Sequence, residues 1–588
     1  MKKICILILC FLMVVFAFSA CNNKEEQTTD TDVEASGSES SSGGQSEVPN
    51  VKYEGFVITE ANKKKLEIYC GNPSNQKTKA AAGDLRNYIR KMTGWTIPIV
   101  RELSDDPDMF HIIVGACDIT EELGYECESG YPGKESVTVS QKDNYLILMG
   151  NDDGLYNGTQ FSVNLILEKL GCGWFAEDPL WTIVPSLDVL DLNVGDVYLN
   201  FIPRFSSRSS RVLGASPNLA HRWYQGGEKT MLGHWLYQVV PATEYADHPE
   251  WFALVNGTRN PENITYWHFC YSNPEFADRI ADEVIKKFDA VPELVSMTIA
   301  ANDGWEYNWC ECDTCKSLGN VSDVMVCFAN NVAQKVSQTY PEKRLQIYSY
   351  HNTYLPPQNT VKLHEMIELM LCRETNMYQP LDEDFMMPAG KDPVSHIEFT
   401  QSWRQNALEY IEKTSPTHVS IWDWYCIAAD EKGWRRIPWV QGEVAIRNQA
   451  VYEELGAEYV FYDHGPLDSY SEPNTTETYV LRWPLWYVAA KASFDGSLDE
   501  KEILSDACQK LFGSVSQQMF DYFMLLSDMS KNCTAYSNTW IPASLNDVYP
   551  YEDRKQFKVL AEEILAAAAG DSEEVQERVR QQLAYWLS

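Results

Sequence analysis

Positive charge is scarce in this sequence. The 588 residues hold 48 Lys and Arg against 84 Asp and Glu, which gives a formal net charge of −36. Nucleic-acid backbones and anionic lipid surfaces attract proteins through cationic faces, so this excess of acids argues against both kinds of partner. Uncharged sugars are not repelled, and the 18 Trp, 32 Tyr and 22 Phe supply flat apolar rings suited to stacking.

Long apolar runs and several signature motifs are also absent. After residue 18 no run approaches the roughly 18 apolar residues that a membrane-spanning helix needs. The sequence has no G-x-S-x-G and no H-E-x-x-H, and Gly154-Leu-Tyr-Asn-Gly158 lacks the Lys-Ser/Thr end of a phosphate loop. These absences exclude further membrane spans and two common classes of hydrolase.

Residues 1–50 have the pattern of a bacterial lipoprotein leader. Lys2 and Lys3 precede the apolar run Ile4–Phe18, and the small residues before Cys21 resemble a lipobox. We therefore expect a signal peptide over 1–20 and diacylglyceryl transfer to Cys21; the alternatives are a plain signal peptide or a membrane helix with an incidental cysteine. The Ser-, Gly-, Thr- and acid-rich composition after Cys21 predicts a disordered tether over 21–50. The expected location is extracytoplasmic, with the lipid anchor as the only membrane contact.

The rest of the chain predicts an α/β protein with three folded regions. Residues 51–195 read as a small α/β domain with strands at 66–70, 97–100 and 111–114, a hairpin at 136–149, and helices at 78–92 and 154–170. Residues 497–588 contain helical patterns at 501–512, 515–530, 552–568 and 573–587 and predict an α-helical C-terminal region.

Residues 200–490 alternate strand and helix patterns and predict a central (β/α)8 TIM-like barrel. The eight expected strands are 205–213, 219–223, 235–240, 295–300, 345–350, 367–372, 418–422 and 458–462. The helices expected between the later strands are 274–288, 324–339, 399–414 and 442–455.

Polar and aromatic side chains follow five successive expected strands of the barrel, at the ends where such barrels hold their active sites. They are Asp303, Trp305, Glu306, His351, Arg373, Glu374, Trp422, Asp423, Trp424, Tyr425, Asp463 and His464. Carboxylates among aromatic rings are the groups that glycoside hydrolysis uses.

Four of these residues are predicted to be catalytic. Asp303 or Glu306 is expected as the general acid, and Glu374 and Asp423 as base, nucleophile or electrostatic stabiliser. The other eight are expected to bind substrate. For any single acid the alternative is an N-cap of the next helix, because Asp is common there.

The cysteines include one cluster, Cys310-Glu-Cys312-Asp-Thr-Cys315. Three thiols at this spacing predict part of a tetrahedral structural zinc site, with Cys327, Cys270 or a His as fourth ligand. A local disulfide and uncoordinated packed thiols are the alternatives. No cofactor is expected for catalysis.

Several segments resemble the domain-of-unknown-function 4838 family over roughly 200–490. They are His248–Gly257, Tyr271–Glu275, Asn302-Asp303 with the three cysteines, Tyr340–Lys343 and Ile421–Tyr425. Ala80–Ile89 and Leu170–Phe175 resemble the domain that precedes the barrel in alpha-glucuronidases and beta-hexosaminidases. The resemblance implies a two-layer domain beside a glycosidase-like barrel, with Glu306 favoured as the acid by analogy with alpha-glucuronidases. Asn302-Asp303 departs from the adjacent Asp-Glu pair of the hexosaminidases.

These observations predict a surface-anchored glycoside hydrolase that acts on complex glycans. The alternatives are a glycan-binding surface lipoprotein without activity and an interaction scaffold based on the helical C-terminus. Residues 1–20 hold two Lys, and 22–50 hold one Lys and seven acids, so the remaining chain has a net charge of −32. Unless Arg208, Arg211 or Arg373 offsets this acidity locally, neutral or N-acetylated glycans are favoured over uronic acids.

Overall fold

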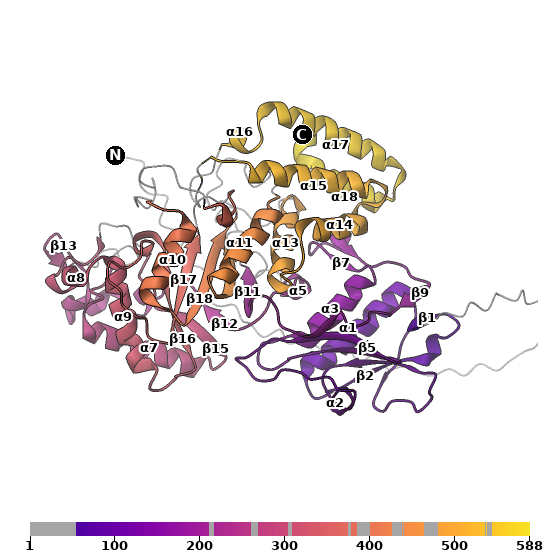
Figure 1. Ribbon diagram of the computed structural model, residues 1–588, viewed down its shortest axis with the longest axis horizontal. Helices are drawn as coiled ribbons and strands as arrows, with labels where there is room; N and C mark the ends of the chain where they lie inside the picture. Colours follow the sequence, from indigo (N-terminus) through magenta and orange to yellow (C-terminus); the bar gives the residue numbers. More distant parts are fainter. Residues whose placement is uncertain are drawn as a thin grey trace, which may run out of the picture. The chain divides into compact units, whose positions relative to one another are not determined.

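The computed structural model describes most of the chain from residue 55 onward (Figure 1). The described residues are 55–210, 217–259, 268–303, 308–373, 378–384, 400–425, 438, 440–463, 480–535, 537 and 544–588. The expected lipidation residue Cys21 and the predicted tether lie outside them.

A six-stranded sheet is formed by the first part of the described chain. Its order is β10 (Tyr198–Phe201), β5 (Val137–Lys142), β6 (Tyr145–Gly150), β4 (Phe110–Val114), β2 (Leu66–Cys70) and β3 (Ile99–Val100). β2, β3, β4 and β6 run parallel, whereas β5 pairs antiparallel with β6 and β10. The predicted strands and hairpin of this region are therefore confirmed.

Two helices, α1 (Gln76–Thr93) and α3 (Gly158–Lys169), cover one face of this sheet (Figure 1). α1 begins where the Asn75 side chain accepts the Lys77 N–H, and it ends at Gly94, whose φ of 75° is left-handed. Leu85 and Ile89 of α1 are fully buried in the core that the helices share with the sheet. The amphipathic pattern predicted for 78–92 thus becomes the buried side of a two-layer unit.

A seven-stranded parallel sheet is formed by the central part of the described residues. Its order is β11 (Ser207–Ser210), β19 (Ala457–Asp463), β18 (His418–Trp424), β17 (Ile367–Arg373), β16 (Arg344–Ser349), β15 (Leu294–Thr298) and β12 (Lys229–Met231). The sheet is curled, and an isolated bridge between Arg208 of the edge strand β11 and Gly226 connects this edge to the segment that precedes β12 at the other edge. This is the TIM-like barrel architecture that the alternating pattern predicts.

Each barrel strand has one face toward the helices and one toward the lumen. The helices α7 (Pro274–Ala290), α9 (Val321–Val336), α10 (Trp403–Thr414) and α11 (Gly442–Glu454) lie along the outside of the sheet (Figure 1). The lumen holds a separate apolar cluster that includes Tyr348, Met370, Trp422, Trp424 and Phe461. Because successive side chains alternate between faces, the neighbours of these residues point toward the helices.

Two of the eight predicted strands are wrong. The segment 219–223 lies in helix α5 (Pro217–Arg222) and 235–240 contains helix α6 (Leu236–Val239). The strand between them, β12, was not predicted because it is three residues long and begins with the exposed Lys229. Short apolar runs do not distinguish a strand from a buried helical turn.

The last part of the chain is helical, as predicted. It comprises α13 (Trp483–Phe494), α14 (Glu500–Leu511), α15 (Ser516–Lys531), α16 (Leu545–Val548), α17 (Tyr551–Ala567) and α18 (Glu573–Leu587). The Trp181 indole donates to Gln581 of α18 at 3.0 Å, and Arg578 Nε donates to the Leu180 carbonyl at 2.9 Å. No helix within the described residues is long and apolar enough to cross a membrane.

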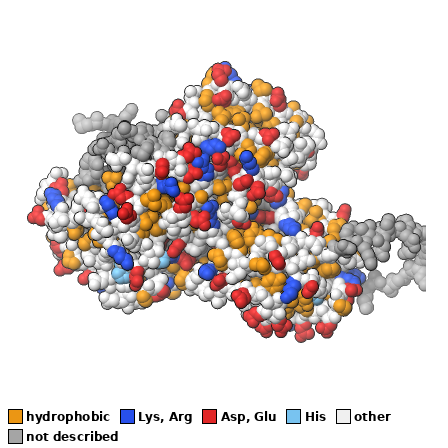
Figure 2. Space-filling view, in the orientation of Figure 1, with side chains coloured by type: hydrophobic (Ala, Val, Ile, Leu, Met, Phe, Trp, Pro, Cys, Tyr) orange, Lys and Arg blue, Asp and Glu red, His pale blue; other side chains and the backbone are white. Residues whose placement is uncertain are grey.

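Lys and Arg side chains lie among Asp and Glu side chains on the face shown in Figure 2. Arg447 contacts Asp382 at 2.7 Å, Arg404 contacts Glu454 at 2.8 Å, and Lys531 contacts Glu443 at 2.7 Å. These ion pairs engage several of the few Lys and Arg side chains with neighbouring carboxylates.

Candidate active site

A small pocket lies at the C-terminal ends of β15 and β16. Its lining comes from the segments that follow β12, β15 and β16, together with His268 and Trp309. The polar and aromatic lining includes His234, His268, Asn302, Asp303, Trp309, Tyr348, Tyr350, His351 and Asn352. The structure thus brings two predicted site residues, Asp303 and His351, to one pocket.

Asp303 is the acidic residue among the described lining residues. It follows β15 and is half-buried, and no hydrogen bond or ion pair joins its carboxylate to another described residue. The preceding Asn302 is buried, and its backbone N–H donates to the Tyr271 hydroxyl at 3.2 Å. The backbone beside Asp303 is therefore fixed while its carboxylate remains available to a ligand.

Histidines form part of the same pocket. His234 Nδ1 lies 2.6 Å from the Ala301 carbonyl oxygen, which sets the orientation of its ring. His351 has a φ of 46°, a left-handed conformation that costs a non-glycine residue about 1–3 kcal/mol. The surrounding structure holds His351 in this conformation at the edge of the pocket.

The barrel lumen below the pocket is lined by aromatic rings. The Trp422 and Trp424 rings are stacked with centroids 5.5 Å apart and an interplanar angle of 16°, and Tyr350 stacks on Trp424 at 6.3 Å. Tyr348 meets Trp422 edge-on at 5.5 Å and accepts the Gly233 N–H at 2.9 Å. Burial raises the pKa of Tyr348, so its phenol stays protonated. This wall offers flat apolar faces with polar edges.

Asp463 lies on the lumen side of β19, since it alternates with the lumen residues Tyr459 and Phe461. It is 2% exposed, and its Oδ2 accepts the Trp422 indole N–H at 2.9 Å. Asp463 was predicted to bind substrate, and its position also fits an electrostatic role.

Asp423 was predicted to be catalytic, but it points toward the helices. Its Oδ1 contacts Arg373 at 3.0 Å and its Oδ2 accepts the Tyr452 hydroxyl of α11 at 2.5 Å. Asp423 and Arg373 are both 0% exposed. The ion pair raises the pKa of Arg373 even though burial opposes its charge. This geometry gives the pair a structural role.

Tyr425, predicted to bind substrate, also faces away from the lumen. It is fully buried, and its hydroxyl accepts the side-chain amide N–H of Asn448 on α11 at 2.8 Å. Trp422 and Trp424 lie in the lumen as a binding role requires. The remaining predicted residues Trp305, Glu306, Glu374 and His464 lie outside the described residues.

Several pocket residues were not predicted. Tyr348 and Tyr350 alternate within and just after β16, and their spacing with His351 was a signal that both face the mouth. His234 was missed because the segment after it was assigned as a strand. His268 and Trp309 come from loops whose positions no local pattern reveals.

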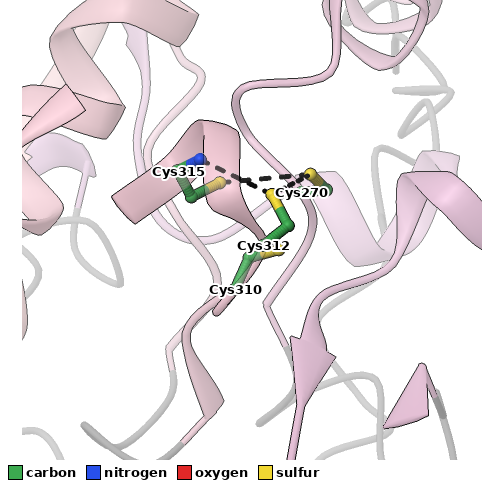
Figure 3. Close-up of side chains that lie close together, drawn as sticks. All are labelled: Cys270, Cys310, Cys312 and Cys315. Carbon is green, nitrogen blue, oxygen red and sulfur yellow. Dashed lines mark hydrogen bonds between the residues drawn. The ribbon is translucent and has the colours of Figure 1, made fainter. Parts of the chain in front are cut away.

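The cysteine cluster lies next to this pocket, because Cys270 and Cys310 closely follow the lining residues His268 and Trp309. Figure 3 shows its four side chains. Cys270 joins Cys310, Cys312 and Cys315, and the four Sγ atoms lie within 4.8 Å of one another. Cys327, another suggested fourth ligand, is on α9 and accepts the Asn331 amide N–H at 3.9 Å. Of the alternatives named from the sequence, Cys270 is the residue placed with the three cysteines.

Two solved structures illustrate the likeness of the fold to known proteins. A family GH115 4-O-methyl-alpha-glucuronidase with specificity for decorated arabinogalactans matches with a TM-score of 0.52 and 10% identity, over 91% of this chain and 72% of that one. A family 89 glycoside hydrolase from Clostridium perfringens matches with a TM-score of 0.44 and 7% identity, over 87% of this chain and 61% of that one. At these identities the likeness concerns the fold. A search of curated proteins found no significant match.

One family model matches the chain. The model of the domain of unknown function DUF4838 matches residues 199–524, which is more than half of the chain. The match begins beside β10 and continues beyond the predicted barrel boundary of 490 through α14 into α15. The curled sheet, its lumen and the pocket at Asp303 all lie within it, and this chain is a member of the DUF4838 family.

Proposed function

We propose that this protein is a glycoside hydrolase that acts on complex glycans at the pocket beside Asp303. The observation that carries the proposal is the combination at one barrel mouth of Asp303, the lumen carboxylate Asp463 and the stacked rings of Trp422, Trp424 and Tyr350. Glycoside hydrolysis needs an acid for the leaving oxygen and a second carboxylate that stays ionised. A glycosidase-like fold supports the same reading.

Asp303 serves as the general acid in this proposal. Its carboxylate reaches the pocket and has no partner among the described residues, so it can donate a proton to a glycosidic oxygen. Asp463, which accepts the Trp422 indole N–H, is the second carboxylate and stabilises positive charge that develops on the sugar. Glu306 and Glu374 remain predicted partners from outside the described residues.

The aromatic wall binds the sugar rings. The half-buried Tyr350 ring, supported by the buried Trp424 behind it, stacks on the apolar face of a sugar, and the Trp424 indole N–H has no partner among the described residues. A buried donor without a partner favours a ligand that brings an acceptor. Sugar hydroxyl groups and N-acetyl carbonyls are such acceptors.

Neutral or N-acetylated glycans are favoured over uronic acids. Arg208 is 1% exposed and contacts Glu135 at 2.6 Å, and Arg373 is held by Asp423. Both arginines are therefore already paired with carboxylates of the protein. Arg211 lies outside the described residues. No Lys or Arg is among the described lining residues of the pocket. Recognition of a uronate would lack the bidentate cation that carboxylates prefer.

The proposal includes a lipid anchor at Cys21, which places the enzyme on the outer side of a bacterial membrane. The 22–50 segment would let the folded part reach glycans at a distance from that membrane.

The test is release of reducing ends from a glycan panel that spans neutral, N-acetylated and uronic-acid polymers. Asp303→Asn should lose at least about 100-fold in kcat, the lower range for removal of an acid–base group. Asp278→Asn is the matched control, since this exposed residue on α7 is remote from the lumen. Binding without release by the wild-type protein would instead support the non-catalytic glycan-binding alternative.

A further inference from the structure

Four thiols from two separate segments meet beside the pocket. Cys270 precedes α7, and Cys310, Cys312 and Cys315 lie at the start of α8 (Asp313–Leu318). The Cys270 Sγ is 3.7 Å from the Cys312 Sγ and 4.0 Å from the Cys315 Sγ (Figure 3). A disulfide needs about 2.05 Å, whereas four sulfurs around zinc at about 2.3 Å stand about 3.8 Å apart. The observed separations match the tetrahedral arrangement.

Hydrogen-bond donors surround the sulfurs. The backbone N–H of Leu254 donates to Cys310 Sγ at 3.3 Å, and that of Cys315 donates to Cys312 Sγ at 3.5 Å. The Ser272 hydroxyl lies 3.0 Å from Cys315 Sγ, and an Arg259 guanidinium nitrogen lies 4.0 Å from Cys310 Sγ. Such donors and a nearby cation stabilise thiolates, and they are the usual outer partners of a metal-bound thiolate.

We propose that Cys270, Cys310, Cys312 and Cys315 form a four-thiolate zinc site. All-cysteine ligation with no open position is typical of structural rather than catalytic zinc. The spacing of the cysteines supports a structural zinc site. Cys312-x-x-Cys315 lies at the start of a helix, and Cys270, which is 40 residues before Cys310, completes the set of four ligands. This inference does not depend on the proposed hydrolase activity.

The site fixes one wall of the active-site pocket. His268 and Trp309, which line the pocket, are within two residues of a ligand and stack with centroids 4.0 Å apart. Tyr271, next to Cys270, accepts the Asn302 N–H beside Asp303. Zinc thus ties the 268–272 and 309–315 segments together and holds the pocket wall against the end of β15.

The first test is the metal content of the full-length protein after reduction and dialysis. The expected result is about one equivalent of zinc, and cobalt substitution should give the sulfur-to-metal charge-transfer and visible bands of a tetrahedral tetrathiolate. Less than about half an equivalent of any metal, or two disulfides in place of four thiols, would overturn the proposal. An iron centre in place of zinc would overturn the choice of ion.

The second test uses a matched pair of cysteine variants. Cys270→Ser should lower zinc affinity by at least about tenfold, whereas Cys327→Ser on α9 should bind zinc as the wild type does. Equal zinc affinity of Cys270→Ser and wild type would contradict the assignment of Cys270. If Cys270→Ser does not fold, the cobalt spectrum of the wild-type protein decides the ligand set.

Hydrogen exchange tests the link to the pocket. Removal of zinc by a chelator should speed amide exchange in 268–273 and 308–318 and leave β17 unchanged, because β17 is remote from the thiols. Unchanged exchange in both segments after complete zinc removal would refute the bracing role.

Discussion

The role of Asp423 is the most direct test of the site geometry. Asp423→Ala should destabilise the fold, because it leaves the Arg373 guanidinium buried without its carboxylate. The lost contacts are the 3.0 Å ion pair and the hydrogen bonds from Tyr452 at 2.5 Å and the Trp424 N–H at 2.8 Å. Removal of one partner from such a buried pair costs about 3–5 kcal/mol.

This cost predicts the thermal shift. Unfolding entropy is about 2.1 cal/mol/K per residue, so the unit Phe56–Ser588 has about 1.1 kcal/mol/K. A loss of 3–5 kcal/mol then lowers Tm by about 3–5 °C. The double variant Asp423→Leu with Arg373→Met should recover much of this loss, since apolar replacement of both partners is often close to neutral.

The assay combines thermal and denaturant unfolding with glycan hydrolysis. The single variant should lose stability, and at temperatures well below its Tm the folded fraction should retain hydrolysis. An Asp423→Asn protein with unchanged Tm and denaturation midpoint but no hydrolysis would refute the structural role. That result would return Asp423 to the catalytic chemistry predicted from the sequence.

Three further predictions concern other parts of the chain. Burial raises the pKa of Glu500 to about 7, although both its oxygens accept the Ser527 hydroxyl. The pKa of Glu500 is higher in the folded protein than in the unfolded chain. The stabilising effect of Glu500 is therefore complete below about pH 4.5 and is lost as pH rises through about 7. The free energy of unfolding changes by about 3 kcal/mol over this range. The difference in unfolding free energy between Glu500→Gln and wild type should change by the same amount between these two pH values. A difference that stays constant with pH would contradict the prediction. Trp422→Phe keeps an aromatic ring but removes the hydrogen-bond donor to Asp463. The kcat should fall about tenfold or more, and Tm should stay almost unchanged. Full activity of this variant would argue against a role for the hydrogen bond. Cys21→Ala should abolish incorporation of labelled fatty acid and move the protein from the membrane fraction to the soluble fraction, whereas retention of the label would exclude Cys21 as the lipidated residue.

Much of the fold was predictable because its elements have strong local patterns. β17 and β18 are rich in apolar residues and buried on both faces, and α7 has an Asn273 cap followed by Pro274 and a clear apolar stripe. β12 was not predictable because three residues at a sheet edge give too little pattern.

The site was less predictable because it depends on which face of a strand is the lumen. In a strand buried on both sides, Trp422, Asp423 and Trp424 all look alike from the sequence, and alternation does not say which set faces inward. Tertiary packing decides the orientation, because the Tyr452 hydroxyl on the helix side donates a hydrogen bond to Asp423. Likewise Cys270 was one of several candidate ligands, since chain separation hides its contact with Cys312.

Three features lie close to the ends of β15 and β16 at the barrel mouth. His351 has a left-handed backbone, His268 stacks on Trp309, and four thiols crowd beside the end of β15. On the outer side of β17 and β18, by contrast, Asp423 is satisfied by Arg373. This contrast supports our proposal that the chemistry takes place beside Asp303, and it agrees with a structural role for Asp423 on β18.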